Sequence, residues 1–173
     1  MIVVRFFGAF FIILSCFLTG YIPKKKFQIA ILEIENFITC IDIFNIEVQN
    51  GFADVFDALG KAAAQASFMN NKILSSFIDL KSITDSKTLC ERWEENLFNH
   101  VNECLYNKNE LNIIQKFGSL LGKGDEFTQD NNVDALKKSL SIEIEKRREN
   151  IAKKDMILKI YLYMGVLVII ILL

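Results

Sequence analysis

The sequence predicts an all-α protein: a helical bundle flanked by a membrane-spanning helix at each end. The chain of 173 residues contains only 1 proline and 8 glycines, so few positions interrupt a helix. Hydrophobic residues make up 51% of the chain, and the mean hydropathy of +0.27 is high for a soluble domain. The apolar excess lies at the two ends. Because the length suits a single domain, we expect one bundle between these ends.

The first expected element is a transmembrane helix over residues 1–23. Residues 6–22, FFGAFFIILSCFLTGYI, carry no charge, and together with residues 2–5 they are long enough to cross a bilayer core. The alternatives are a cleaved signal peptide, with Arg5 as its positive start, or a lipoprotein signal around residues 13–16. The long apolar stretch and the lack of a small-x-small cleavage site before the PKKK stretch favour the span.

The last expected element is a second transmembrane segment over residues 156–173. Residues 160–173 are uncharged. At about 1.5 Å per residue they reach roughly 21 Å, short of the ~30 Å hydrocarbon core. Residues 156–158 bring the segment close to that length if Lys159 extends its ammonium group to the interface.

Positive charges beside the apolar ends predict the topology. These flanking residues are Lys24, Lys25, Lys26, Lys153, Lys154 and Lys159. Positive residues concentrate on the cytoplasmic side of membrane segments, so we expect residues 24–155 in the cytoplasm and both chain ends outside. The net charge of −1 provides no general attraction for nucleic acid.

Residues 24–155 are expected to form a cytoplasmic bundle of consecutive helices. The first carries Phe27, Ile31, Ile34, Ile38 and Ile41 at three- and four-residue steps, and it ends near residues 50–51. A second helix begins near residue 54 and is broken at residues 70–71. A short third one covers residues 72–82.

Capping boxes predict the start of the next two helices. Thr88 with Glu91 begins one that runs through Leu105, and Asn107 with Glu110 begins another. A last helix runs from about residue 131 into the membrane. Its charged residues 143–149 predict a solvated face with ion pairs or, alternatively, a contact with a partner or anionic lipid.

The glycines near residue 120 are similar at first sight to a phosphate-binding loop. Such a loop needs four residues between its glycines and then Lys-Ser/Thr. Only three residues separate Gly118 from Gly122, and Gly124 stands where the hydroxyl should be. We therefore expect no nucleotide here. Gly122 or Gly124 suits a helix C-cap, and Gly118 would let a neighbouring helix approach closely.

No other stretch predicts a catalytic, cofactor-binding or metal site. His100 and Cys104 have a spacing that could ligate zinc, but a structural zinc site needs four ligands. The spacing of Cys40 and Cys90 does not suggest that they complete one. The chain has four cysteines, Cys16, Cys40, Cys90 and Cys104, and their spacing shows no pairs. This pattern favours a reducing compartment.

Four features together match a pattern known from one protein family. The most specific comprises Phe117, Gly118, Leu121, Gly122, Asp125 and Gln129; the others are Tyr161 with residues 163–166, the stretch FNIEVQNGFADVFDAL at residues 44–59, and Trp93. Over nearly its whole length the chain resembles the stage III sporulation protein AB family of endospore-forming bacteria. It departs from the family mainly at Leu162 and Val168, where an Arg and a Gly are usual.

The resemblance implies a non-enzymatic component of the complex that links mother cell and forespore. Its soluble domain would be similar to the cytoplasmic domain of type II secretion platform proteins. The implied partners are an AA-type cytoplasmic ATPase and polytopic membrane components, without cofactor, nucleic acid or small-molecule substrate. The implied location is the mother-cell membrane around the forespore. An alternative, a membrane sensor with a cytoplasmic helical domain, is disfavoured because almost no residues are expected outside.

Overall fold

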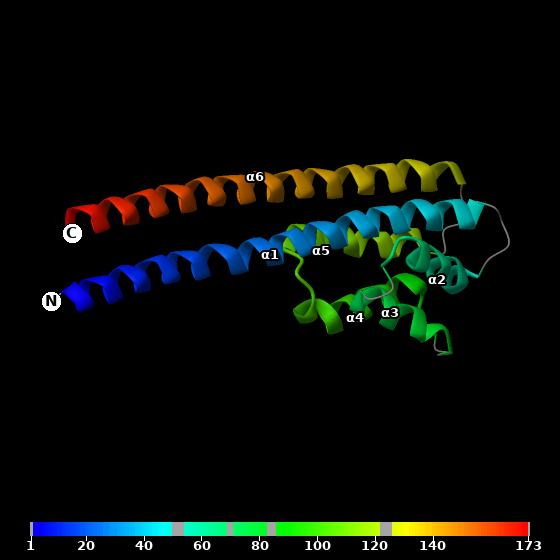
Figure 1. Ribbon diagram of the computed structural model, residues 1–173. Coiled ribbons are helices and arrows are strands. Elements are labelled where there is room, and N and C mark those ends of the chain that lie inside the picture. Colours follow the sequence, from blue (N-terminus) through cyan, green and yellow to red (C-terminus); the bar gives the residue numbers. More distant parts are fainter. Residues whose placement is uncertain (1, 50–53, 69–70, 83–85, 122–125, 173) are drawn as a thin grey trace. The chain divides into compact units, whose positions relative to one another are not determined.

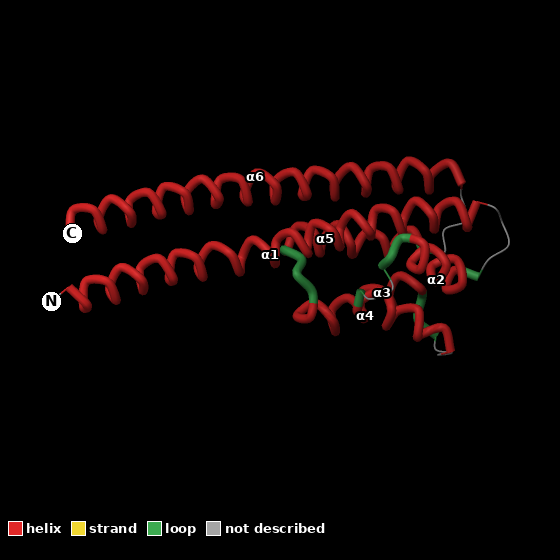
Figure 2. Tube along the Cα trace, in the orientation of Figure 1, coloured by secondary structure: helices red, strands yellow, loops and turns green. Residues whose placement is uncertain are grey.

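The structure, a computed structural model, consists of helices joined by loops and turns and contains no strand in the residues it describes (Figures 1 and 2). The backbone is described for residues 2–49, 54–68, 71–82, 86–121 and 126–172. Side chains are described for residues 8, 25–49, 54–68, 71–82, 86–121, 131–160 and 163–164. The helices are α1 (Ile2–Gln49), α2 (Val55–Gln65), α3 (Lys72–Asp79), α4 (Leu89–His100), α5 (Lys108–Phe117) and α6 (Glu126–Leu172), with 3₁₀ turns η1 (Leu80–Ser82), η2 (Val101–Glu103) and η3 (Gly118–Leu120). The all-α expectation is confirmed.

The chain divides into two compact units. One comprises residues 1–29 and 145–173, and the other comprises residues 30–144. We call the second unit the helical bundle. Its core is apolar and draws on every helix of the bundle, as expected for a domain that folds around one hydrophobic centre.

Aromatic rings occupy the centre of the helical bundle. Trp93 of α4 is 1% exposed, and the rings of Phe77 and Phe117 meet it nearly edge-on at centroid distances of 5.0 and 5.3 Å. Phe117 in turn lies 5.5 Å from Phe37 and 5.6 Å from Phe44, both on α1. Edge-to-face contacts at these distances are favourable beyond the burial of area. The rings therefore join α1, α3, α4 and α5.

Both predicted capping boxes are present. Thr88 Oγ1 accepts from Glu91 N at 3.2 Å, and Glu91 Oε2 accepts from Thr88 N at 2.8 Å. The corresponding distances for Asn107 and Glu110 are 2.9 and 2.7 Å. These bonds satisfy backbone N–H groups that a helix start would otherwise leave without partners. They define where α4 and α5 begin.

Several predicted helix limits were wrong. The helix from Thr88 stops at His100 and not at Leu105. A tertiary contact explains the early end: Tyr106 leaves the helix, and its hydroxyl accepts a hydrogen bond from Asn71 Nδ2 at 2.8 Å. The second helix ends at Gln65, before the expected break, and Ser67 follows with a φ of 54°. The last helix begins at Glu126.

The apolar stripe of α1 differs in part from the expected one. Ile31, Ile34 and Ile41 are buried as predicted, whereas Ile38 is only half-buried. The buried face also includes Ala30, Phe37, Cys40 and Phe44. Spacing alone selected the isoleucines, but the neighbouring helices cover the adjacent face, which carries the two phenylalanines.

Within the residues whose side chains the structure describes, no helix combines the length and apolar character needed to cross a membrane. Almost all side chains of the predicted span 1–23, and most of those of the predicted span 156–173, lie outside that description.

Candidate functional site

The described part of the family motif lies at the C-terminal end of α5 and in the turn η3 that follows, next to α4. Gly118 has φ −54° and ψ −33°, an ordinary right-handed conformation, so flexibility is not what glycine provides there. A Cβ atom at this position would lie 2.5 Å from Trp93 Cδ1 and 3.0 Å from Trp93 Cγ. The close approach predicted for Gly118 is therefore present, and the group that approaches is the indole of Trp93.

The indole is held in place on several sides. Trp93 Nε1 donates to the carbonyl oxygen of Ile114 on α5 at 3.0 Å. Phe117, the residue before the glycine, packs edge-on against the same ring. A buried indole N–H needs such an acceptor, because leaving it without one costs about 1–3 kcal/mol. Trp93, Phe117 and Gly118 thus form one packed unit that fixes α5 against α4.

The rest of the motif is described only in part. Leu121 is 5% exposed, and its backbone N–H donates to the carbonyl oxygen of Gly118 at 3.2 Å. Gly122 and Asp125 lie outside the described residues, as do the C-caps predicted at Gly122 or Gly124. Gln129 lies within α6, with its side chain outside the description.

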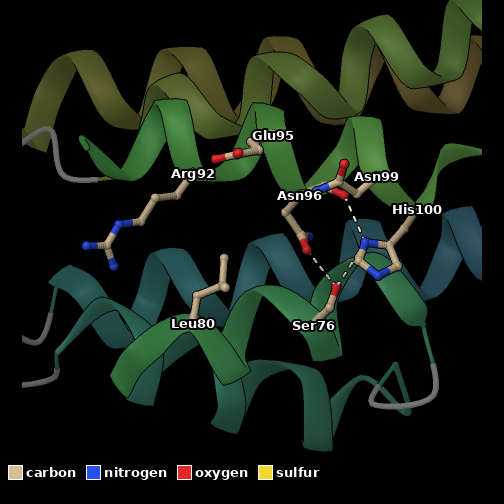
Figure 3. A pocket seen from close by; sticks show the side chains of 7 residues that line it. All are labelled: Ser76, Leu80, Arg92, Glu95, Asn96, Asn99 and His100. Atoms are coloured by element: carbon tan, nitrogen blue, oxygen red, sulfur yellow. Dashed lines mark hydrogen bonds between the residues drawn. The ribbon is translucent and has the colours of Figure 1, made fainter. Parts of the chain in front are cut away.

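A polar pocket of about 310 Å³ lies between α3 with η1 on one side and α4 on the other (Figure 3). Its lining residues are Ser76, Leu80, Arg92, Glu95, Asn96, Asn99 and His100. Among these residues, only His100 was a candidate from the sequence. Arg92, Glu95, Asn96 and Asn99 share one face of α4 with His100, whereas Ser76 and Leu80 come from α3 and η1, which meet that face only in the folded bundle.

Hydrogen bonds tie the pocket floor together. Asn96 is 5% exposed; its Nδ2 donates to the carbonyl oxygen of Ile73 at 2.6 Å, and its Oδ1 accepts from Ser76 Oγ at 2.7 Å. His100 Nδ1 lies 3.0 Å from the carbonyl oxygen of Asn96. Because a carbonyl can only accept, Nδ1 carries the hydrogen, and in neutral His100 the other ring nitrogen, Nε2, is an acceptor.

The Ser76–His100 pair does not have the arrangement of an activated nucleophile. Ser76 Oγ lies 3.5 Å from His100 Nδ1, a nitrogen that already holds a hydrogen for Asn96. A serine nucleophile needs a neighbouring base able to take its proton. The Ser76 hydroxyl also lies within donating distance of two groups that can only accept, the carbonyl oxygen of Lys72 at 2.5 Å and Asn96 Oδ1 at 2.7 Å. Its one hydrogen is directed to these acceptors, so the contacts organise the pocket floor and not a reaction.

Two thiols of the helical bundle, those of Cys40 and Cys104, are held protonated at neutral pH. Burial raises the pKa of Cys40 to about 12. Burial, and to a smaller extent the charges of Glu33 and Glu103, raise the pKa of Cys104 to about 11. A thiol is reactive and ligates metals as the thiolate, so neither group is suited to either role at neutral pH. In the described part of the chain, no three His, Cys, Asp or Glu side chains are grouped to hold a metal ion.

The predicted flanking lysines lie on the surface where their side chains are described. Lys25, Lys26, Lys153, Lys154 and Lys159 are exposed, and the side chain of Lys24 lies outside the description. Lys154 Nζ lies 4.3 Å from the ring centroid of Phe27, and Arg147 Cζ lies 5.7 Å from the same centroid. These cation–π contacts join α1 and α6 within the unit of residues 1–29 and 145–173.

The fold and its sites define an all-helical protein whose most specific features are packing contacts between helices. A family model, stage III sporulation protein AB, matches residues 5–173. The chain therefore belongs to the stage III sporulation protein AB family, as the sequence resemblance indicated. This identifies a sporulation protein, and the family is described by its part in sporulation and not by a catalysed reaction. No curated protein and no solved structure matches the chain.

Proposed function

We propose that this protein is a membrane-anchored, non-enzymatic adaptor in the channel or secretion-like complex between mother cell and forespore. It links a cytoplasmic ATPase to the polytopic membrane components of that complex. Membership of the sporulation family supports the process in which it acts. The packed aromatic core of the helical bundle supports a rigid connecting part, because edge-to-face rings join four helices there.

Exposed apolar side chains near the C-terminal end carry the proposal of membrane anchoring. Met156, Ile157, Ile160, Tyr163 and Met164 are 59, 49, 55, 76 and 57% exposed. Exposing such a row of apolar side chains to water is unfavourable by about 25 cal/mol for each Å² of apolar surface. Lipid would cover it, and the exposed Lys153 and Lys154 lie where lipid headgroups are expected. Residues 156–173 are accordingly proposed as one transmembrane helix and residues 1–23 as the other.

The flanking lysines support the proposed orientation. With positive charge concentrated between the two spans, the helical bundle faces the mother-cell cytoplasm. The membrane is the one surrounding the forespore, where an ATPase in the mother-cell cytoplasm would reach the bundle. The function requires no cofactor, because the adaptor works by binding proteins.

Cysteine labelling tests the topology. In a variant with the four native cysteines replaced by alanine, single cysteines are introduced by Ser141→Cys, an exposed site in the bundle, or by Leu173→Cys. Protoplasts of non-sporulating cells that express the protein, in which the chain ends would face the medium across the cell membrane, are treated with a membrane-impermeant maleimide. We expect labelling of Leu173→Cys in intact protoplasts and of Ser141→Cys only after lysis. Labelling of Ser141→Cys in intact protoplasts would overturn the orientation.

Co-purification tests the adaptor function itself. The tagged full chain is extracted in detergent from sporulating cells, and the bound ATPase and membrane components are identified by mass spectrometry. A matched control keeps both end segments but replaces residues 30–144 with an unrelated helical domain. We expect the ATPase with the native chain and not with the control. Recovery of the ATPase with neither chain would contradict the proposal.

A further inference from the structure

The outer face of α4 carries the most exposed large apolar side chain in the described part of the protein. Phe98 is 79% exposed. Three glutamates accompany it on the same helix, Glu91, Glu94 and Glu95, and all three are exposed. Because residues three and four apart adjoin on a helix surface, Glu94 and Glu95 lie directly beside Phe98. An exposed aromatic ring within a charged rim is the arrangement of an interface centre.

This face adjoins the polar pocket. Glu95 lines the pocket and is also a neighbour of Phe98, so it forms the border between them. Figure 3 shows Arg92 extending away from the end of the pocket where Asn96 and His100 lie. We call Phe98, Glu91, Glu94, Glu95 and the adjoining pocket the α4 face.

The α4 face is acidic. Helix α4 contains three glutamates against one arginine. Glu95 Oε2 forms an exposed ion pair with Lys87 at 2.6 Å. Glu94 Oε1 accepts a hydrogen bond from Gln115 Nε2 at 3.1 Å, and because an amide is neutral, this contact does not offset the negative charge of Glu94. Acidic surfaces steer basic partners toward them and exclude acidic ones.

The pocket beside Phe98 offers acceptors to a cation. Its carboxylate is that of Glu95, its amide oxygen that of Asn99, and Nε2 of neutral His100 is an acceptor because Nδ1 faces the carbonyl of Asn96. The Asn96 side chain does not compete, since both its ends are bonded within the bundle. A long side chain ending in N–H donors, lysine or arginine, fits this set.

We infer that the α4 face is a docking surface for a basic segment of a partner protein, with a lysine or arginine entering the pocket at Glu95 and apolar side chains covering Phe98. The inference rests on the proposed adaptor function and names the surface that function would use. Aromatic side chains at the centre of an interface commonly carry much of the binding free energy, so Phe98 is the expected anchor.

The test measures binding of the purified cytoplasmic ATPase to the full chain in detergent, by biolayer interferometry at low and moderate salt. Phe98→Ser should weaken binding by about tenfold or more. Glu95→Gln should weaken it by roughly threefold and reduce its salt dependence. Matched controls are Ile46→Ser, at a 57% exposed residue of α1, and Asp134→Asn, at a side chain of α6 that is 76% exposed. Both controls should bind within about twofold of the native chain, since neither residue lies on α4.

Each other outcome has a distinct meaning. If the native chain binds and the Phe98 and Glu95 variants bind equally well, the α4 face is not the docking surface, and the adaptor function stands. If the native chain does not bind the ATPase, the adaptor function fails and the inference with it. If sedimentation shows that the native chain self-associates and that only this association is lost in Phe98→Ser, the occupant is a second copy, and the partner assignment is overturned.

Discussion

Gly118 and Trp93 are in contact so close that the position has no room for a side chain. A Cβ atom at residue 118 would lie 2.5, 3.0 and 3.1 Å from Cδ1, Cγ and Cβ of the tryptophan. The ring cannot move aside cheaply, because it is bonded to the Ile114 carbonyl and held between Phe77 and Phe117. The family motif is thus explained by packing at this residue.

Gly118→Ala should therefore destabilise the helical bundle. The added methyl group would force the indole or α5 to shift, which typically costs about 1–3 kcal/mol. The measurement is urea unfolding of the full chain in detergent, monitored by the fluorescence of Trp93, the only tryptophan in the sequence. The free energy of unfolding should fall by that amount.

Gly60→Ala is the matched control. Gly60 lies inside α2, and a Cβ atom there would have no neighbour within 4 Å. Since alanine favours a helix interior over glycine, this variant should be more stable by about 0.5–1 kcal/mol. The same chemical change is thus expected to have effects of opposite sign at the two positions, which makes the comparison sharp. A loss of stability shared by both variants would contradict the steric explanation.

A double-mutant cycle should assign the cost to the pair Gly118 and Trp93. In a Trp93→Leu background the smaller side chain leaves space beside residue 118, so the second substitution, Gly118→Ala, should cost less than in the native chain. A coupling of about 1 kcal/mol or more is expected for residues in direct contact. Circular dichroism replaces fluorescence as the probe, because the tryptophan is removed. Additive costs would show that the methyl group meets something other than the indole.

Asn71 should contribute to stability through two separate interactions. Its Oδ1 accepts from the backbone N–H groups of Ile73 and Leu74 at 3.1 and 3.3 Å, and its Nδ2 donates to the hydroxyl of Tyr106 at 2.8 Å. Asn71→Ala loses both and should reduce the free energy of unfolding by about 2 kcal/mol. Tyr106→Phe keeps the cap; it removes the second interaction together with the hydrogen bond between the Tyr106 hydroxyl and Glu33, and should cost about 1 kcal/mol. Thermal unfolding of both variants gives the comparison, and the reverse order would be incompatible with the cap.

Stability should decline at alkaline pH. Burial raises the pKa of Cys104 from 9.0 to about 11, so the folded chain holds this proton more tightly than the unfolded chain. Such a group contributes its full stabilisation below pH 9, and the contribution is lost as pH rises toward 11. Burial also raises the pKa of Tyr106, which extends the decline further upward.

Cys104→Ala isolates the thiol in this decline. The free energy of unfolding of the native chain, measured by urea at a series of pH values, should fall more steeply between pH 9 and 11 than that of the variant. Tyr106→Phe should leave the decline between pH 9 and 10 intact and reduce it only above pH 10, where the phenol of the unfolded chain begins to titrate. If the alanine variant follows the native profile throughout, titration of Cys104 is not linked to folding.

The local features of this fold were predictable because their causes lie within a few residues of sequence. Thr88 with Glu91 and Asn107 with Glu110 form their capping boxes by short-range bonds, so the starts of α4 and α5 could be predicted. The end of α4 could not. It depends on Tyr106 reaching Asn71, a residue far away in sequence, and the periodicity of apolar residues contains no information about that bond.

The sequence by itself determined that this chain is helical, where most of its helices begin, and which family it belongs to, because propensity, capping and motif spacing are properties of neighbouring residues. Only the tertiary structure decided what those residues meet. It paired Gly118 with Trp93, brought Ser76 of α3 to Asn96 and His100 of α4, and left Phe98 uncovered. These contacts depend on how the faces of separate helices pack, which is set by the whole core and not by any one stretch of sequence.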